Sequence, residues 1–145
     1  MPNEFQRISQ FFAPLASDQT EAFGLKDDAA CLPSLSAGER WVVTKDAIAE
    51  GIHFIGTESP ELIAKKLLRT NVSDLAAMGA TPRYYLLAIM LPAHIDDDWL
   101  AAFVAGLAED QHQFGITLLG GDSICVASDK LSFSLTAFGL SLIHI

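Results

Sequence analysis

The chain has 145 residues, half of them hydrophobic, and carries a formal net charge of −9 with a pI of about 4.6. This length fits one domain with a sizeable core, and the hydrophobic fraction excludes a disordered chain. The negative charge and the lack of Lys/Arg clusters argue against nucleic-acid and membrane partners. The charge is explained most simply by solubility. The alternative is an acidic protein that handles phosphates through bound metal cations.

The two cysteines and the N-terminus indicate a cytoplasmic protein. Cys31 and Cys125 are isolated and show no CxxC spacing, so we expect buried, reduced thiols. The first residues lack a basic start followed by an apolar run, and therefore do not look like a signal peptide. The longest apolar run, 84–91, ends at Pro92 and is far too short to span a membrane.

Hydrophobic spacing and turn residues predict the secondary structure. The first half of the chain is expected to form a helix over 4–12 ended by Pro14, a short strand after Asp28, a hairpin connection over 34–40, a strand over 41–44 and a loop over 47–54. A helix over 61–78 follows, with an apolar face that includes Leu62 and Met78. The second half is expected to form a strand buried on both faces over 84–91, a helix over 99–114 ended by Gly115, a strand over 116–119 and a half-buried strand over 131–138. This order fits an α/β or α+β fold, a mixed β-sheet layered with helices.

The triplet Asp96-Asp97-Asp98 looks like a metal site, but it directly precedes a predicted helix. An N-cap and first-turn charges that favour the helix dipole explain it better. Lys65, Lys66 and Arg69 are expected on a solvated helix face.

Four other segments carry acidic groups that we expect to converge on shared divalent metal ions and a nucleotide phosphate. They are Lys26-Asp27-Asp28, Thr44-Lys45-Asp46, Asp74 within an apolar helical pattern, and Gly120-Gly121-Asp122. A buried carboxylate in such a helix is costly unless a cation meets it. Hard cations such as Mg²⁺ take carboxylate, water and phosphate oxygens. Each Asp alone is more often a turn residue than a ligand.

The glycine pair and a nearby histidine leave alternatives open. Gly120 and Gly121 follow a predicted strand, where positive φ would let a phosphate approach the backbone; an ordinary Gly-Gly turn fits equally well. His53, in a predicted loop, either contacts an anionic substrate or is simply solvated.

Several stretches together resemble the N-terminal domain of thiamine-monophosphate kinase, in the aminoimidazole-ribonucleotide-synthetase-like superfamily. The resemblance covers about 4–139 and rests on Lys26-Asp-Asp-Ala-Ala30, Thr44-Lys-Asp46, Glu50-Gly-Ile-His-Phe54, Asn71-Val-Ser-Asp-Leu-Ala-Ala-Met-Gly-Ala80 with Pro82, and Leu119-Gly-Gly-Asp122. The stretch from Asn71 is the most specific of these.

The resemblance implies ATP-dependent phosphorylation of thiamine phosphate to thiamine diphosphate, with Mg²⁺ as cofactor. It implies a homodimer in which two sheets close into a barrel. The implied metal ligands are Asp28, Thr44, Lys45, Asp46, Asp74 and Asp122; Gly121 and Asp122 would contact ATP, and His53 the substrate phosphate.

Some positions depart from the family pattern. Lys26 stands where the first motif often has Gly, and Lys45 precedes Asp46 where Thr is common. These two lysines could replace part of the cation requirement. Ser123 in place of Thr is a mild change.

The length also departs from the family. We expect residues 1–139 to form an N-terminal ATP/Mg-binding and dimerisation domain. Residues 140–145 would be a truncation point or an unrelated tail, and the family's C-terminal domain would be absent. Such a fragment would be inactive alone.

Two other functions remain open from the sequence. The first is another ATP-dependent synthetase of the superfamily, forming an amidine or selenophosphate; Cys31, which follows the acidic pair in an apolar context, argues against selenophosphate. The second is a non-catalytic, dimerising module that binds Mg-nucleotide.

Overall fold

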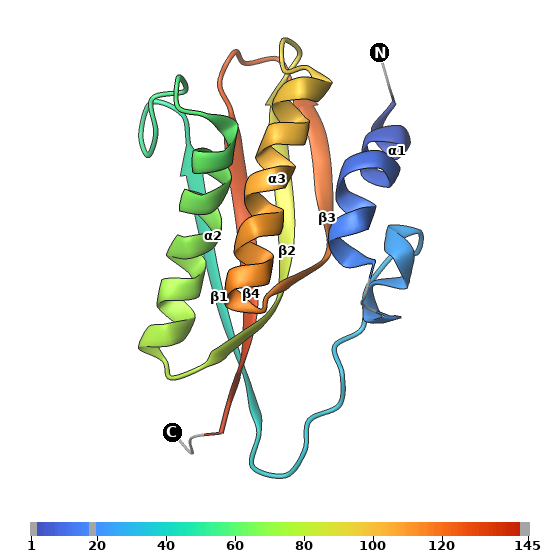
Figure 1. Ribbon diagram of the computed structural model, residues 1–145, viewed down its shortest axis with the longest axis vertical. Helices are drawn as coiled ribbons and strands as arrows, with labels where there is room; N and C mark the ends of the chain where they lie inside the picture. The colour runs from blue at the N-terminus through green and yellow to red at the C-terminus, as the bar shows by residue number, and fades with distance from the viewer. Residues whose placement is uncertain (1–2, 18–19, 143–145) are drawn as a thin grey trace.

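The computed structural model describes residues 3–17 and 20–142, which form one four-stranded mixed sheet with helices (Figure 1). The strands are β1 (Arg40–Ala49), β2 (Thr81–Pro92), β3 (Thr117–Val126) and β4 (Ser132–Ser141), in the spatial order β1-β4-β2-β3. β4 pairs antiparallel with β1 and β2, whereas β2 and β3 are parallel. The predicted mixed α/β architecture is confirmed.

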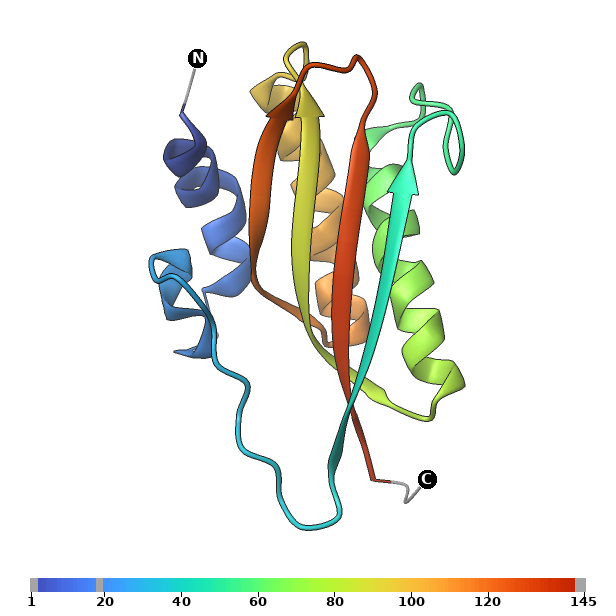
Figure 2. The same cartoon turned by 180° about the vertical axis from the view of Figure 1, so that it is seen from behind.

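Two helices, α2 (Pro60–Ala77) and α3 (Asp97–Phe114), cover one face of the sheet. The alternation along β4 shows the result: Phe133, Leu135 and Ala137 are buried beneath the helices, and the residues between them are only half-buried. Seen from behind, the second face carries no helix from residues 3–17 or 20–142 (Figure 2). We call this second face the open face; it presents Val43, Lys45 and Ala47 of β1, Leu86, Ala88 and Met90 of β2, and Ser134, Thr136 and Phe138 of β4.

β2 was expected to be buried on both faces, but only its helix-covered side is fully buried in this chain.

The ends of the helices agree more closely with the sequence-based predictions. The Asp96 carboxylate accepts a hydrogen bond from the Trp99 amide at 2.8 Å, which confirms the capping interpretation, and Gly115 ends α3 in the left-handed conformation. Where the helices cross, a Cβ on Gly106 would lie 2.6 Å from the Glu61 carbonyl oxygen, so the close contact requires glycine.

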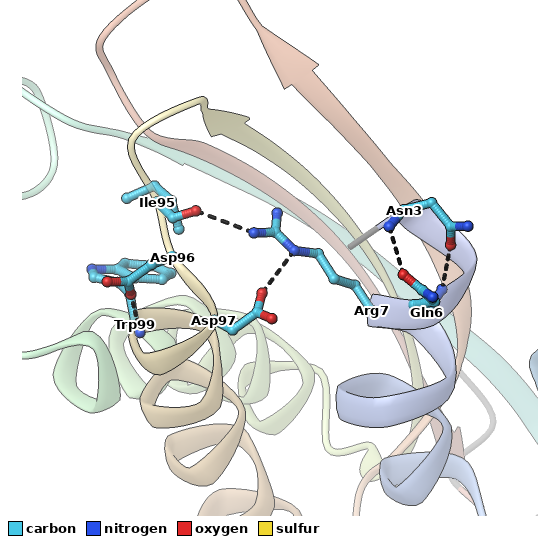
Figure 3. A network of polar contacts seen from close by, with 7 residues as sticks. All are labelled: Asn3, Gln6, Arg7, Ile95, Asp96, Asp97 and Trp99. Carbon is cyan, nitrogen blue, oxygen red and sulfur yellow. Dashed lines mark hydrogen bonds and ion pairs between the residues drawn. The ribbon is translucent and has the colours of Figure 1, made fainter. Parts of the chain in front are cut away.

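The N-terminal segment packs beside β3 and α3. Its helical turns are α1 (Glu4–Arg7), a π-helical turn (Ile8–Phe12) and two 3₁₀ turns (Ala13–Ala16 and Thr20–Leu25). Arg7 fixes it to the start of α3, donating to the Asp97 carboxylate at 3.0 Å and the Ile95 carbonyl at 3.2 Å (Figure 3). Pro14 does not end the helical path as predicted, because proline is tolerated in the first turn of the next helical segment.

Several predicted strand boundaries were wrong. No strand follows Asp28, so the loop over 34–40 is not a hairpin connection. β1 has ten residues rather than the expected four because it pairs with β4 along its whole length, which places Asp46 inside the strand. β3 likewise continues through Gly120 and Gly121, which therefore do not form a turn. β4 includes Leu140 and Ser141; residues 143–145 of the predicted tail lie outside the described residues.

Exposure corrects three further expectations. Leu62 and Met78 of α2 are exposed rather than on its apolar face. Cys31 and Cys125 are free, as expected, but exposed rather than buried. Asp74 is exposed and Asn71, one turn earlier, is the buried polar residue of the helix. Among the described residues, no helix is long and apolar enough to cross a membrane.

Arg69 does not merely face solvent, because it joins α2 to α3. Its guanidinium donates two hydrogen bonds, at 2.8 and 3.0 Å, to the carboxylate of Asp110, whose side chain is 1% exposed. This bidentate contact raises the pKa of Arg69. Lys65 pairs with Glu109 between the same helices, but at the surface.

Replacing Arg69 with Met should lower the urea midpoint of unfolding, because the Asp110 carboxylate would remain buried without its partner. The matched control is Lys65→Ala, which removes an ion pair whose carboxylate is already in solvent. We expect the drop for Arg69→Met to be several times larger. Equal midpoints for the two variants would show that the Asp110 pair adds no more than a surface ion pair.

Candidate functional site

Two of the predicted metal ligands meet where β1 passes beneath α2, and a third lies nearby on the same strand. The Thr44 hydroxyl lies 3.3 Å from the Asp74 carboxylate and donates to it. Asp46 lies two residues further along β1 and therefore on the same face of the sheet as Thr44. The three side chains form an oxygen-rich group, which we call the β1–α2 group.

Lys45 lies on the other face of the sheet. Its ammonium donates to the Ser134 hydroxyl at 2.7 Å and the Thr136 hydroxyl at 3.2 Å, both on the open face. The two-residue alternation of a strand requires this separation from Thr44 and Asp46. Within one chain, Lys45 therefore does not lie beside the carboxylates whose charge it was expected to offset.

The remaining acidic positions line a cavity of about 500 Å³ between the N-terminal segment and β3. Asp27 and Asp28 contribute from the loop after the last 3₁₀ turn, and Gly121 and Asp122 from β3. Most of its other lining side chains are apolar. We call this the β3 cavity.

Gly121 has a structural requirement of its own. A Cβ at this position would lie 1.7 Å from the Leu87 carbonyl oxygen of β2, which no side chain can accommodate. Neither Gly120 nor Gly121 has the positive φ that was expected. The register of β2 and β3 shifts between Tyr85 and Leu86, so this irregular pairing explains the glycine without a phosphate.

The expected convergence of all four acidic segments is not present within one chain. β1 and β3 are the opposite edges of the sheet, and three strand spacings of about 4.8 Å separate them by roughly 14 Å. Across the described ranges 3–17 and 20–142, no three His, Cys, Asp or Glu side chains come together as a metal-binding group. The metal-ligand assignments remain predictions.

His53 is held in the loop that follows β1. The Ala49 amide donates to its Nδ1 at 3.0 Å, so the neutral ring carries its proton on Nε2, where it can donate to an anion. Gly51 provides the positive φ of 86° that this turn needs. Lys66 of α2 donates to the His53 carbonyl, which fixes the loop against the helix.

Two acidic residues to which the sequence analysis assigned no role, Glu50 and Glu58, also order this end of the molecule. Glu50 accepts from the Leu131 amide at 2.9 Å and thereby ties the loop after β1 to the start of β4. The Ile55 and Gly56 amides donate to Glu58 and hold its pKa below the ordinary value. The spacing Glu50-Gly51 before His53 was visible in the sequence, but no pattern indicated its partner.

Asn71 is the other polar residue without an assigned role. Its amide nitrogen donates to the Leu67 carbonyl at 2.9 Å, while its Oδ1 is buried and receives no hydrogen bond from the described residues. Asn71 and Asp74 are three residues apart on α2 and so lie one turn from each other. The β1–α2 group thus consists of oxygen atoms with no cationic side chain bonded to it in the described chain, a donor set that fits Mg²⁺.

The comparisons with known proteins give the family. Residues 26–141 match the family described as AIR synthase related protein, N-terminal domain. Thiamine-monophosphate kinase from Caulobacter vibrioides is 45% identical over 138 residues, which cover 95% of this chain and 39% of the kinase.

Two solved structures add to this. Thiamine-monophosphate kinase from Stenotrophomonas maltophilia has a TM-score of 0.78 and 38% identity, covering 95% of this chain and 42% of that one. The hydrogenase maturation protein HypE of Escherichia coli has a TM-score of 0.75 and 26% identity, covering 94% and 43%.

The chain spans about 40% of the length of the curated relatives it matches. The match to the family model nevertheless covers most of the chain, from the loop that carries Asp28 to the end of β4. The protein therefore belongs to the AIR synthase related family, as an N-terminal domain of that type.

Proposed function

We propose that this chain is the Mg-ATP-binding and dimerising part of a thiamine-phosphate kinase, which transfers the terminal phosphoryl group of ATP to thiamine phosphate. The observation that carries the proposal is the β1–α2 group, where Thr44 and Asp74 lie 3.3 Å apart in a sequence 45% identical to a named thiamine-monophosphate kinase. Because the chain covers about 40% of such a kinase, we propose that it does not turn over alone.

A homodimer would join the two separated groups of ligands. The open face carries half-buried apolar side chains and the 56%-exposed Val43, a surface that a second sheet would cover well. If two open faces close into a barrel, the outer edge of β1 in one copy meets an outer edge of the second copy. If β1 of one copy pairs with β3 of the second copy, the β1–α2 group of the first copy would lie beside the β3 cavity of the second.

In the assembled site, the residues of this chain position phosphates and offset their charge. Asp46 and Asp74 would hold Mg²⁺ through carboxylate oxygens and Thr44 through its hydroxyl, with Asp28 and Asp122 contributing from the β3 side. When bound, Mg²⁺ neutralises phosphate oxygens and orients them. The His53 Nε2–H would donate to the phosphate of thiamine phosphate. No general base is needed, because the acceptor is already an anionic phosphate.

The alternatives have weaker support. The likeness to HypE, at 26% identity, shows that other members of this family share the fold. The higher identity to the Caulobacter kinase favours the kinase over another synthetase. We also propose a cytoplasmic location, for which the two free thiols are the supporting observation.

A chimera tests the activity. This chain would replace the matching 138 residues of the Caulobacter kinase, and thiamine diphosphate would be measured with ATP, Mg²⁺ and thiamine phosphate. We expect activity in the chimera and a loss of at least 100-fold, about 2.7 kcal/mol of transition-state stabilisation, in its Asp46→Asn and Asp74→Asn forms.

The matched control for this series is Asp129→Asn, an exposed carboxylate in the loop before β4. We expect it to keep full activity. Full activity in either Asp46→Asn or Asp74→Asn would contradict the metal assignment. A folded chimera that forms no thiamine diphosphate would contradict the proposed reaction.

The dimer is tested separately by placing a charge on the open face. Val43→Asp should shift the chain from dimer to monomer in light scattering, since two copies of the new carboxylate would be buried in the interface. Leu62→Asp alters an equally exposed apolar residue on the outer side of α2 and should leave the dimer intact. Loss of the dimer in both variants, or in neither, would contradict an interface on the open face.

A further inference from the structure

We propose that Glu50 is a positioning residue for His53 and holds its ring in the orientation that recognises the phosphate of thiamine phosphate. This inference rests on the proposed function, in which the His53 Nε2–H donates to that phosphate. Glu50 need not touch the substrate, because it acts through the turn that carries the histidine. The two residues share one short stretch, Glu50-Gly-Ile-His-Phe54.

The orientation of the His53 ring depends on this turn. The Ala49 amide donates to Nδ1 at 3.0 Å, and this bond leaves the proton of the neutral ring on Nε2. The backbone makes a second contact between the same residues, because the His53 amide donates to the Ala49 carbonyl at 2.9 Å. A rotation of the turn away from the end of β1 would therefore weaken both bonds together.

Glu50 fixes the start of the turn to β4. Its amide donates to the Leu131 carbonyl at 2.9 Å. In a regular antiparallel ladder, the Leu131 amide would complete this pair by donating to the Glu50 carbonyl. Here the Leu131 amide donates to the Glu50 carboxylate instead, at 2.9 Å. The side chain thus replaces a main-chain acceptor at the point where β1 leaves the sheet, and the Leu131 amide stays paired.

The same carboxylate also holds the returning arm of the loop. Gly56 packs against it so closely that a Cβ at Gly56 would lie 2.4 Å from the Glu50 Oε1. Between the two arms, the Gly51 amide donates to the Phe54 carbonyl at 2.7 Å. The Lys130 ammonium lies 3.8 Å from the carboxylate, but its side chain is 57% exposed, so this ion pair adds little. The Leu131 hydrogen bond and the contact with Gly56 therefore carry the role.

The remaining contact of His53 does not fix the ring. Lys66 of α2 donates to the His53 carbonyl, which attaches the backbone of the turn to the helix. Without Glu50, His53 would stay on α2 while the turn separates from β4 and from Ala49. Either ring nitrogen could then carry the proton. The fraction of molecules that present an Nε2–H to the phosphate would fall, and thiamine phosphate would bind more weakly.

Steady-state kinetics of the chimera with the Caulobacter kinase tests this role. In Glu50→Ala, we expect the KM for thiamine phosphate to rise about ten-fold, with kcat and the KM for ATP nearly unchanged, because only substrate binding is weakened. Glu50→Gln should restore the KM for thiamine phosphate, since its amide oxygen can still accept from the Leu131 amide. A residue that supports only the fold would affect both substrates alike.

Gly56→Ala is a second variant in case Glu50→Ala does not fold. Its new Cβ would displace the Glu50 carboxylate without removing it, and the KM for thiamine phosphate should rise in the same way. The matched control is Glu39→Ala. Glu39 also accepts one main-chain hydrogen bond, from the Ser36 amide at 2.8 Å, but it lies at the opposite end of β1. This control should keep both KM values.

Nitrogen-15 NMR of the His53 imidazole gives an independent readout in the chain itself. We expect an Nε2-protonated ring in the unaltered chain and in Glu50→Gln, and a mixture of the two tautomers in Glu50→Ala. An unchanged ring spectrum in Glu50→Ala would overturn the inference, whatever the activity.

The kinetic outcomes separate the inference from the proposed function. An active chimera in which Glu50→Ala leaves the KM for thiamine phosphate unchanged, or raises both KM values equally, would overturn the inference and leave the proposed reaction intact. A folded chimera without turnover would contradict the proposed reaction, and the imidazole spectrum alone would then decide whether Glu50 positions the ring.

Discussion

β1 is an edge strand with a helix on one side and, in the part of the chain that the structure describes, no covering element on the other; this one-sided covering decides where its chemical groups lie. Thr44 and Asp46 lie on the face that α2 covers, and the Thr44 hydroxyl is hydrogen-bonded to Asp74 of that helix. Lys45, between them, points to the open face and bonds to Ser134 and Thr136. A shift of one residue in the pairing of β1 with β4 would exchange these faces and place the lysine under the helix.

The register of β1 is held by features far from the acidic residues. Ile48 is buried beneath the helices, which fixes the residues of β1 that face the helix layer at the end of the strand. Glu50 then ties the chain to the start of β4 through the Leu131 amide. On the helix side, the Arg69–Asp110 pair and the glycine crossing at Gly106 fix α2 against α3. The separation of about 3 Å between Thr44 and Asp74 thus depends on the packing of the whole helix layer.

Sequence reasoning succeeded where one local signal decides the outcome. Asp96 before α3 and Gly115 after it determine the ends of that helix through their own backbone geometry. The strict alternation over 131–138 likewise predicted a half-buried strand. Sequence reasoning failed where the length of a strand is set by the neighbouring strand with which it pairs. β1 and β3 continue beyond their most apolar residues because β4 and β2 offer backbone groups to pair with, and no property of Asp46 or Gly121 reveals that pairing.

The candidate site follows the same division. Residue types identified the carboxylates as candidates, and the prediction that they meet in one place assumed a single centre. Sheet order contradicts that within one chain, since Asp122 and Asp46 belong to opposite edges. An oxygen-only group lies at one edge of the sheet, and a largely apolar cavity with an acidic lining lies at the other. In the dimer that we propose, the open face between them would be the surface on which two copies bring these groups together.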